Sequence, residues 1–169
     1  MKLKRSFYLR PTIEVAQDLL GKFLVRRYRG KIYQAEICET EAYRGFDDKA
    51  CHGHKSRTKR NEMMFHHGGL AYVYLIYGVY HCLNLVTENK DFPSAVLIRG
   101  LDCKNCDGPG KLCRAFKITK KNCNGLDICS NILWIEDRGA KVKYEKLKRV
   151  GVDYANECKD WLCLGSNTS

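Results

Sequence analysis

The sequence predicts a single α+β domain built around an antiparallel β-sheet. A length of 169 residues is that of one domain with its own buried core. Apolar and aromatic segments of strand length outnumber helical ones, and they do not follow the β-α-β order that marks a parallel sheet. Hydrophobic residues make up 44% of the chain and charged residues 29%, and no Pro- or Ser-rich tract is present, which excludes a disordered chain.

The first half of the chain supplies a helix and then a pair of strands. Apolar residues recur at helical spacing in 11–21, and a glycine ends this predicted helix. Two strands, 22–28 and 31 to about 43, are predicted on either side of a tight turn at Arg29–Gly30. Residues 58–65 are predicted to form a short helix or a helical turn.

The second half is dominated by strands. Residues 71–77 and 80–87 are the strongest strand candidates, because they are apolar and aromatic on both sides of Gly78. Residues 95–101 form another predicted strand. The remaining predicted elements are one helix at 110–116, after Gly108–Pro109, and two strands at 131–136 and 142–151, separated by Gly139.

The charge balance points to a polyanionic partner. Thirty Lys and Arg against nineteen Asp and Glu give a formal net charge of +11, which favours nucleic acid over an anionic membrane. No apolar run approaches the roughly 20 residues of a membrane span. The charged start of the chain has no apolar signal core behind it, so we expect an intracellular protein.

The ten cysteines are scattered, several lie in apolar runs, and we expect reduced thiols. Cys103 and Cys106 form a C-x-x-C pair with Cys113 nearby. Because a second paired spacing is missing, a loop with small, partly buried thiols is favoured over a structural zinc site. A redox motif is disfavoured, since no thioredoxin-like strand and helix surround the pair.

Residues 39–52 form an acidic and aromatic segment within this basic chain. If 31–43 is extended, the alternation of side chains places six residues on one strand face: Tyr33, Ala35, Ile37, Glu39, Glu41 and Tyr43. Such a face runs from apolar to acidic to aromatic, as in a strand that leaves the core and enters a cleft. The alternative is a solvated strand end with ordinary surface carboxylates.

Cations and tyrosines accompany this segment. Residues 55–60 hold four cations, which form either a solvated loop or a rim that binds phosphates. Tyr72 and Tyr74 share a strand face, where packing is the alternative to stacking on a base. Tyr77 lies at the predicted hairpin tip, a position suited to insertion into a partner. Together these features suggest base stacking, catalysis and backbone docking in one protein.

At these same residues the sequence closely resembles the 3-methyladenine-DNA glycosylases of the alkyladenine type. The resemblance covers most of the chain. The blocks that carry it are VAQDLLGK at 15–22, ETEAY at 39–43, DKACH at 48–52, RTKRN at 57–61, MF at 64–65, YVYLIYG at 72–78, Asn84, AVLIR at 95–99, GPGKLC at 108–113 and RVGV at 149–152.

The resemblance implies roles for individual residues. Glu41 resembles the general base that activates the attacking water, and Arg99 a group that helps to hold this water. Tyr43 and Tyr74 look like the two faces of a base sandwich, and His52 closes the pocket at the base edge. A carboxylate in this place can polarise water and stabilise the positive charge that develops on the sugar.

Further residues are implied to bind DNA. Asn84 looks like the pocket residue that disfavours normal guanine, and Tyr77 like the wedge that fills the hole left by a flipped base. Arg57, Lys59 and Arg60 belong to the cationic rim, where we expect contacts with DNA phosphates. No metal and no cofactor is implied, and no Schiff base with the sugar.

The resulting expectation is a monofunctional DNA repair glycosylase. It would flip and excise alkylated or deaminated purines of the 3-methyladenine, hypoxanthine and ethenoadenine type by hydrolysis, leaving an abasic site. The family fold is a compact mixed domain with a curved antiparallel sheet, so we expect residues 1–169 to form one glycosylase domain. We expect a monomer acting on double-stranded DNA that contains damaged purines, in the nucleus of a eukaryote or the cytoplasm of a bacterium.

Three alternatives remain from the residues themselves. Glu39 and Glu41 superficially form the carboxylate pair of a carbohydrate glycosidase, with backbones about 7 Å apart in an extended strand. A non-catalytic binder of damaged DNA or of RNA shares the basic and aromatic features. A zinc-stabilised nucleic-acid protein would use Cys103 and Cys106.

Overall fold

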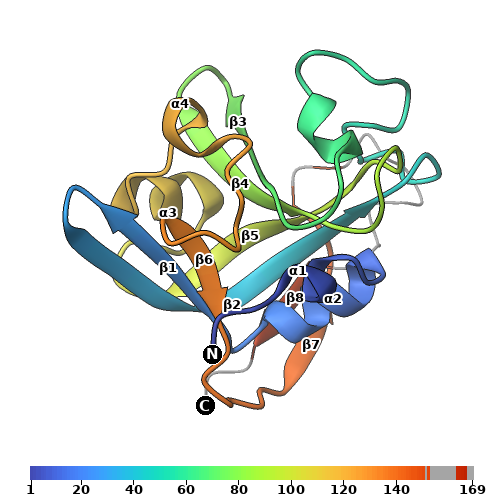
Figure 1. The fold of residues 1–169 in the computed structure, drawn as a ribbon. Helices are drawn as coiled ribbons and strands as arrows, with labels where there is room; N and C mark the ends of the chain where they lie inside the picture. The colour runs from blue at the N-terminus through green and yellow to red at the C-terminus, as the bar shows by residue number, and fades with distance from the viewer. Residues whose placement is uncertain (151, 153–162, 167–169) are drawn as a thin grey trace.

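The centre of the molecule is a strongly curled antiparallel sheet, shown in the computed structural model of Figure 1. The structure describes residues 1–150, 152 and 163–166. The strand order is β3-β4-β5-β2-β1-β6, and β8 joins β7 to β2. Every strand pair is antiparallel. The predicted α+β fold with a curved sheet and a few short helices is therefore confirmed.

The strands are β1 (Phe23–Tyr28), β2 (Lys31–Arg44), β3 (Ala71–Ile76), β4 (Tyr80–Val86), β5 (Ser94–Asp102), β6 (Leu133–Glu136), β7 (Tyr144–Leu147) and β8 (Cys163–Ser166). The helices are α1 (Arg5–Tyr8), α2 (Thr12–Leu19), the 3-10 helix η1 (Glu62–Phe65), α3 (Pro109–Ala115) and α4 (Lys120–Cys123). Most of these elements match the predicted segments, although β6, β7 and η1 are shorter than expected. The short elements α1, α4 and β8 were not predicted.

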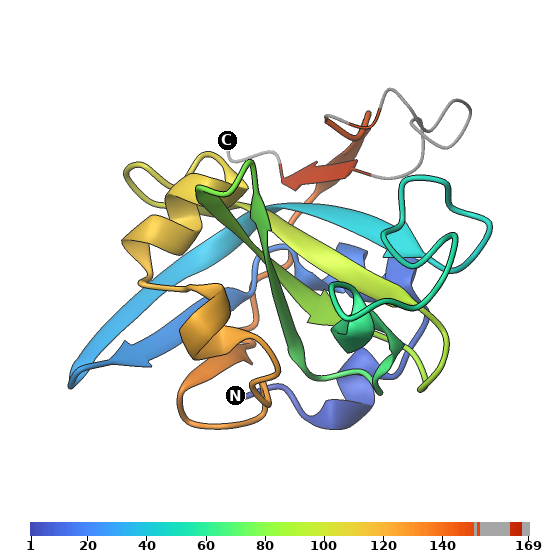
Figure 2. The ribbon, with the colours of Figure 1, turned by 90° about the horizontal axis from the view of Figure 1, so that it is seen from above.

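The two hairpins that shape the sheet follow from their turn residues. Arg29 and Gly30 both have positive φ, 48° and 74°, as a two-residue hairpin loop of type I′ requires. The second hairpin joins β3 to β4, and its tip residues Tyr77 and Gly78 also have positive φ, 53° and 69°. Figure 2 shows this hairpin tip beside α3.

Strand β2 pairs with β1, β5 and β8, and one expectation about it is wrong. The register of β2 against β5 shifts between Ile37 and Thr40, so a bulge interrupts the strand. Before the bulge, Ile37 points into the main core. After it, Thr40 and Ala42 do so, and the Thr40 hydroxyl donates a hydrogen bond to the Ala16 carbonyl of α2. The extra residue inverts the alternation, so Glu41 does not share the face of Ile37.

The same inversion applies to the rest of the predicted face. Tyr33 and Ala35 lie on the main-core side with Ile37, whereas Tyr43 lies with Glu41 on the other side of the sheet. The bulge therefore lets one strand contribute to the core at one end and to a polar cavity at the other. Simple alternation could not anticipate this change of face.

A core lies on each side of the sheet. The main core packs α2 and α3 against the sheet, and a smaller core beneath η1 contains Met64, Phe65, Tyr72 and Tyr74. In Figure 1, α1 and α2 lie on one side of β2, and η1 with its flanking loops lies on the other. The smaller core supports the cavity described next.

Candidate active site

A cavity of about 190 Å³ opens on the η1 side of the sheet. Its walls come from β2, β3, β4 and β5, from the loop that follows β2, from the start of α3 and from the segment after β7. The lining residues are Glu41, Tyr43, Ala50, His52, Met64, Tyr74, Ile76, Tyr77, Cys82, Asn84, Leu97, Arg99, Pro109, Val150 and Val152. All seven residues predicted for catalysis, base binding or the wedge are among them.

Glu41 is the most enclosed charged group of this cavity, with 1% of its surface exposed. The Tyr43 hydroxyl donates a hydrogen bond to Glu41 Oε2 at 2.6 Å, and the Val150 backbone N–H donates to Oε1 at 3.1 Å. Arg99 Nε lies 3.5 Å from Oε1. Because a carboxylate only accepts hydrogen bonds, these donors fix both oxygens of the Glu41 side chain.

Arg99 connects two carboxylates. Its Nε donates to Glu39 Oε1 at 2.7 Å, a shorter contact than the one with Glu41. Glu39 does not line the cavity. It is connected to the site through its contact with the Arg99 guanidinium. Glu39 orients Arg99, and Arg99 faces the cavity beside Glu41.

The aromatic walls are Tyr43, Tyr74 and His52. The rings of His52 and Tyr74 meet edge to face with centroids 4.5 Å apart. His52 Nδ1 also lies 3.1 Å from the hydroxyl of Tyr72, which sits behind the pocket wall. Burial and the nearby Glu41 carboxylate raise the pKa of Tyr43, so its hydroxyl keeps the proton that it donates to Glu41.

The surroundings of His52 favour its uncharged form. Packing against the tyrosines removes water from part of the ring, and this desolvation, together with the positive charge of Arg60, lowers the His52 pKa below its ordinary value. The residue is nevertheless exposed to solvent. A neutral ring adds no charge to this wall of the cavity.

The back of the cavity carries an amide and a thiol. Asn84 is 3% exposed, and its Nδ2 donates to the carbonyls of Tyr72 and Cys82 at 3.2 and 3.4 Å. These bonds hold the amide in one orientation. Burial raises the pKa of the Cys82 thiol to about 11, so this neighbour adds no charge.

The mouth of the cavity carries Tyr77. This side chain is 91% exposed at the β3–β4 hairpin tip, where packing against a core is impossible. A large aromatic ring held in solvent by a left-handed turn is placed for contact with a partner.

Not all of the cations at residues 55–60 are free to contact an anionic partner. The guanidinium of Arg57 donates to Glu62 through Nε at 2.9 Å and to Asp91 through Nη1 at 2.9 Å. It also lies over the ring of Phe65. Lys59 and Arg60 are exposed, and Arg60 borders a hollow beside His52.

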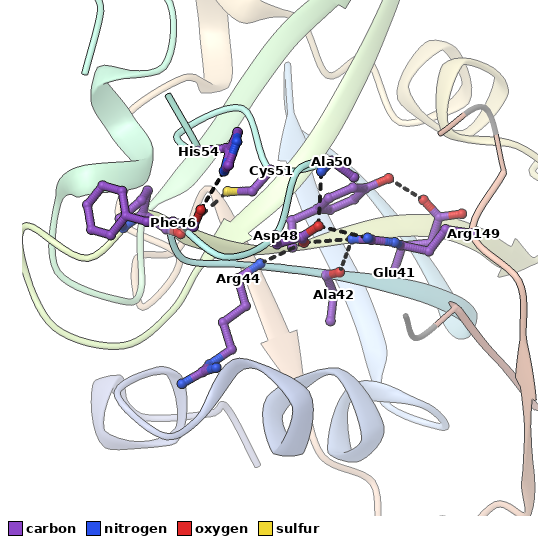
Figure 3. Close-up of polar contacts among 11 residues, drawn as sticks. Glu41, Ala42, Arg44, Phe46, Asp48, Ala50, Cys51, His54 and Arg149 are labelled. Carbon is purple, nitrogen blue, oxygen red and sulfur yellow. Dashed lines mark hydrogen bonds and ion pairs between the residues drawn. The ribbon is translucent and has the colours of Figure 1, made fainter. Parts of the chain in front are cut away.

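A buried ion pair between Arg149 and Asp48 connects segments that form the pocket (Figure 3). The sequence alone does not predict this pair. Arg149 binds Asp48 through two bonds of 2.7 and 2.8 Å, and it donates to the Ala42 carbonyl at 3.0 Å. The Asp48 carboxylate also accepts the backbone N–H groups of Arg44 and Ala50. The pair therefore organises the loop after β2 and brings Val150, the next residue, to Glu41.

Comparison with known proteins identifies the family. A family model of the methylpurine-DNA glycosylases matches residues 6–165. The chain belongs to this family. Because the family is one of DNA glycosylases, the protein is a hydrolase of N-glycosyl bonds that acts on DNA in DNA repair.

Relatives of the methylpurine-DNA glycosylase family are similar over nearly the whole chain. A protein of Methanocella arvoryzae is 49% identical over 174 residues, which cover 92% of this chain and 86% of that protein. A protein of Clostridium novyi is 43% identical over 187 residues, covering 95% and 92%. A protein of Anaeromyxobacter sp. is 49% identical over 161 residues, covering 92% and 83%. Each of the three has been assigned as a 3-methyladenine DNA glycosylase.

Family membership decides against a carbohydrate glycosidase and a non-catalytic binder. The zinc alternative is also wrong, as is the expectation that all thiols are reduced, because Cys103 and Cys106 form a disulfide. Their Cα atoms lie 5.5 Å apart, within the range that a disulfide spans. No group of three or more metal-ligating side chains occurs in the described part of the chain. Within that part, too, no helix is long and apolar enough to span a membrane.

Proposed function

We propose that this glycosylase flips alkylated and deaminated purines out of duplex DNA and hydrolyses their N-glycosidic bond, leaving an abasic site. The substrate class includes 3-methyladenine, hypoxanthine and 1,N6-ethenoadenine. The observation that carries the proposal is Glu41, a buried carboxylate held by two hydrogen bonds and an ion pair in an aromatic cavity. Its mouth bears the exposed ring of Tyr77.

Glu41 is the proposed general base. As the bond between sugar and base breaks, the bonding electrons leave with the base and positive charge develops on the sugar. Glu41 takes a proton from the attacking water, whose oxygen bonds to the sugar carbon, and its negative charge stabilises the transition state. Val150 and Tyr43 hold the carboxylate in place during this step, and Arg99 helps to orient the water.

Tyr43, Tyr74 and His52 are the proposed base-binding groups. An alkylated purine is cationic, and it gains about 0.5–2 kcal/mol from each aromatic face that it contacts. A neutral lesion such as hypoxanthine lacks this attraction and needs protonation or tighter contacts. We assign to Asn84 the exclusion of guanine, which its buried and hydrogen-bonded amide supports.

Flipping a base costs a few kcal/mol, less for a damaged base. We propose that Tyr77 fills the gap left in the duplex and so offsets part of this cost. Arg57, Lys59 and Arg60 supply a cationic rim for phosphates, with the smallest contribution from Arg57 because Glu62 and Asp91 already neutralise it. The enzyme would act as a monomer, in the compartment that holds the genome.

The test uses duplex oligonucleotides that each carry one hypoxanthine, 1,N6-ethenoadenine, 3-methyladenine or uracil. Released base and alkali-labile sites are measured for the native protein, for Glu41→Gln and for Glu39→Gln. We expect the native protein to release at least one damaged purine but no uracil. Glu41→Gln should bind the same duplex and release nothing, since an amide cannot accept the proton from water.

Glu39→Gln is the matched control, because Glu39 lies two residues away, contacts the same Arg99 and is not part of the cavity wall. It should keep measurable activity. Release of no damaged purine by the native protein, or full activity of Glu41→Gln, overturns the proposed function.

A further inference from the structure

A second and wider hollow of about 320 Å³ lies across the β3–β4 hairpin from the base cavity. Ile76 and Tyr77 line the base cavity, whereas Val79 and Tyr80 line the second hollow. The hairpin tip therefore forms a ridge between the two spaces. Figure 2 shows α3 running beside this hairpin. Gly110, Cys113 and Arg114 of α3 line the second hollow, here called the α3 groove.

The groove is formed by close packing of α3 on β4. A Cβ atom on Gly110 would lie only 2.9 Å from the ring of Tyr80, so only glycine allows this approach. Beyond α3, a capping box at Thr119 and Asn122 starts α4, and the Asn122 side chain donates to the Lys117 carbonyl. The backbone that carries the groove's polar side chains is thus fixed by its own hydrogen bonds.

The groove is cationic. Residues 108–126 contain five Lys and Arg and no Asp or Glu. Two of these cations, Arg114 and Lys117, line the groove together with His81, and both are exposed. In the part of the chain that the structure describes, neither forms an ion pair, whereas Lys111 pairs with Asp107. Arg57, on the other side of the site, is bound by two carboxylates.

We propose that the α3 groove binds the sugar–phosphate backbone of the DNA strand opposite the damaged nucleotide. This inference rests on the proposed function, in which Tyr77 enters the duplex at the flipped base pair. A hairpin inserted there has the damaged strand on the side of the base cavity and the intact strand on the side of the groove. Arg114 and Lys117 then each neutralise a phosphate, which fixes the duplex on the enzyme without reading its sequence.

The test replaces both cations, in the double variant Arg114→Gln/Lys117→Gln. The matched control is Lys4→Gln/Lys141→Gln, which removes the same charge from exposed residues near α1 and the segment after β6. Fluorescence anisotropy measures the affinity for a duplex carrying a lesion, and for its damaged strand alone, as salt is varied from about 50 to about 200 mM.

For the groove variant, the slope of log Kd against log salt on the duplex should fall by about two, one for each lost phosphate contact. Across that salt range the duplex then loses about ten-fold less affinity than with native protein. The slope on the single strand should stay unchanged, and the control should match the native protein on both. An equal fall of the slope on both substrates would assign the groove to the damaged strand. An unchanged slope on the duplex would show that the groove does not bind DNA. Either result overturns the proposal.

Fluorescence anisotropy measures the binding of DNA and does not require that the base is excised. A native protein that binds duplex DNA but releases no damaged purine would defeat the proposed function, while the comparison of duplex with single strand still decides the role of the groove. A urea unfolding curve identical to that of the native protein shows that the variant is folded.

Discussion

Two sets of ion pairs flank the candidate site, and they differ mainly in their access to water. The side chains of Arg149 and Asp48 are 0% and 1% exposed, whereas those of Arg57 and Glu62 are 42% and 41% exposed. Both use two-pronged arginine contacts of similar length. From this difference we expect the pocket to depend on the buried pair more than on the exposed one.

The buried pair joins segments that are far apart in the chain. Asp48 accepts the backbone N–H groups of Arg44 at the end of β2 and of Ala50 in the loop, and Arg149 donates to the Ala42 carbonyl of β2. The Arg149 guanidinium also lies 4.9 Å from the ring centroid of Tyr43. An ion pair of this kind contributes little net stability compared with apolar packing, but losing one partner leaves an unpaired buried charge. The exposed pair has no such penalty, because water replaces the lost partner.

The largest expected effect follows from removing one half of the buried pair. Asp48→Asn leaves the Arg149 charge without its counter-ion, so we expect the free energy of unfolding to fall by about 3–5 kcal/mol. Urea unfolding monitored by circular dichroism measures this change. Val150 should also lose its place beside Glu41, so that excision slows more than duplex binding weakens.

The matched control is Asp18→Asn, which makes the same chemical change in an exposed pair with Arg10. It should change the free energy of unfolding by less than about 1 kcal/mol. A similar effect of Asp48→Asn and Asp18→Asn would contradict the distinction drawn from burial.

Asp48 and Arg149 also show why part of the site was not predictable from sequence. They lie 101 residues apart, and nothing local to either residue identifies its partner. The block at 149–152 carries family resemblance, but resemblance alone assigns no contact. By contrast, Tyr77 at a hairpin tip and the apolar runs of β3 and β4 follow from local pattern, and the structure agrees with them.

The bulge in β2 explains the main error about the fold. Alternation correctly extends from Tyr33 to Ile37, but one inserted residue reverses it before Glu41. Sequence spacing carries no signal for this shift, since it depends on how β5 and β8 pair with β2. The cations of 111–121 give no local signal for a different reason. They are spread over two helices and the segment between them, and only the fold gathers two of them in one groove.

His52 lies between the two extremes, because its ring packs against Tyr72 and Tyr74 while the residue stays exposed. Its pKa is lowered in the folded protein, so the unfolded chain binds more protons below the ordinary pKa of about 6.5. The stability that His52 contributes is therefore present above this value and is lost as pH falls through the lowered pKa. We expect a modest loss of stability as the pH is lowered from about 7.5, one unit above the ordinary pKa, into the acidic range.

Urea unfolding of native protein and His52→Gln across this pH range isolates the contribution. The groups that face the ring, Arg60, Tyr72 and Tyr74, remain in both proteins. The difference in stability between the two proteins should therefore shrink as the pH falls. A constant difference would show that desolvation of His52 has no effect on folding.

The smallest effect is expected for the exposed pair. Arg57→Gln removes both ion pairs with Glu62 and Asp91, but these groups are open to water, so the urea midpoint should not change measurably. In duplex binding, Arg57→Gln should lower the salt slope by less than Arg60→Gln, which is expected to lower it by about one. The reason is that Glu62 and Asp91 already neutralise Arg57, and its loss releases their charge beside the DNA. An equal weakening of duplex binding by Arg57→Gln and Arg60→Gln would contradict this expectation. It would show that the Arg57 guanidinium leaves its carboxylates when DNA binds and contacts a phosphate instead.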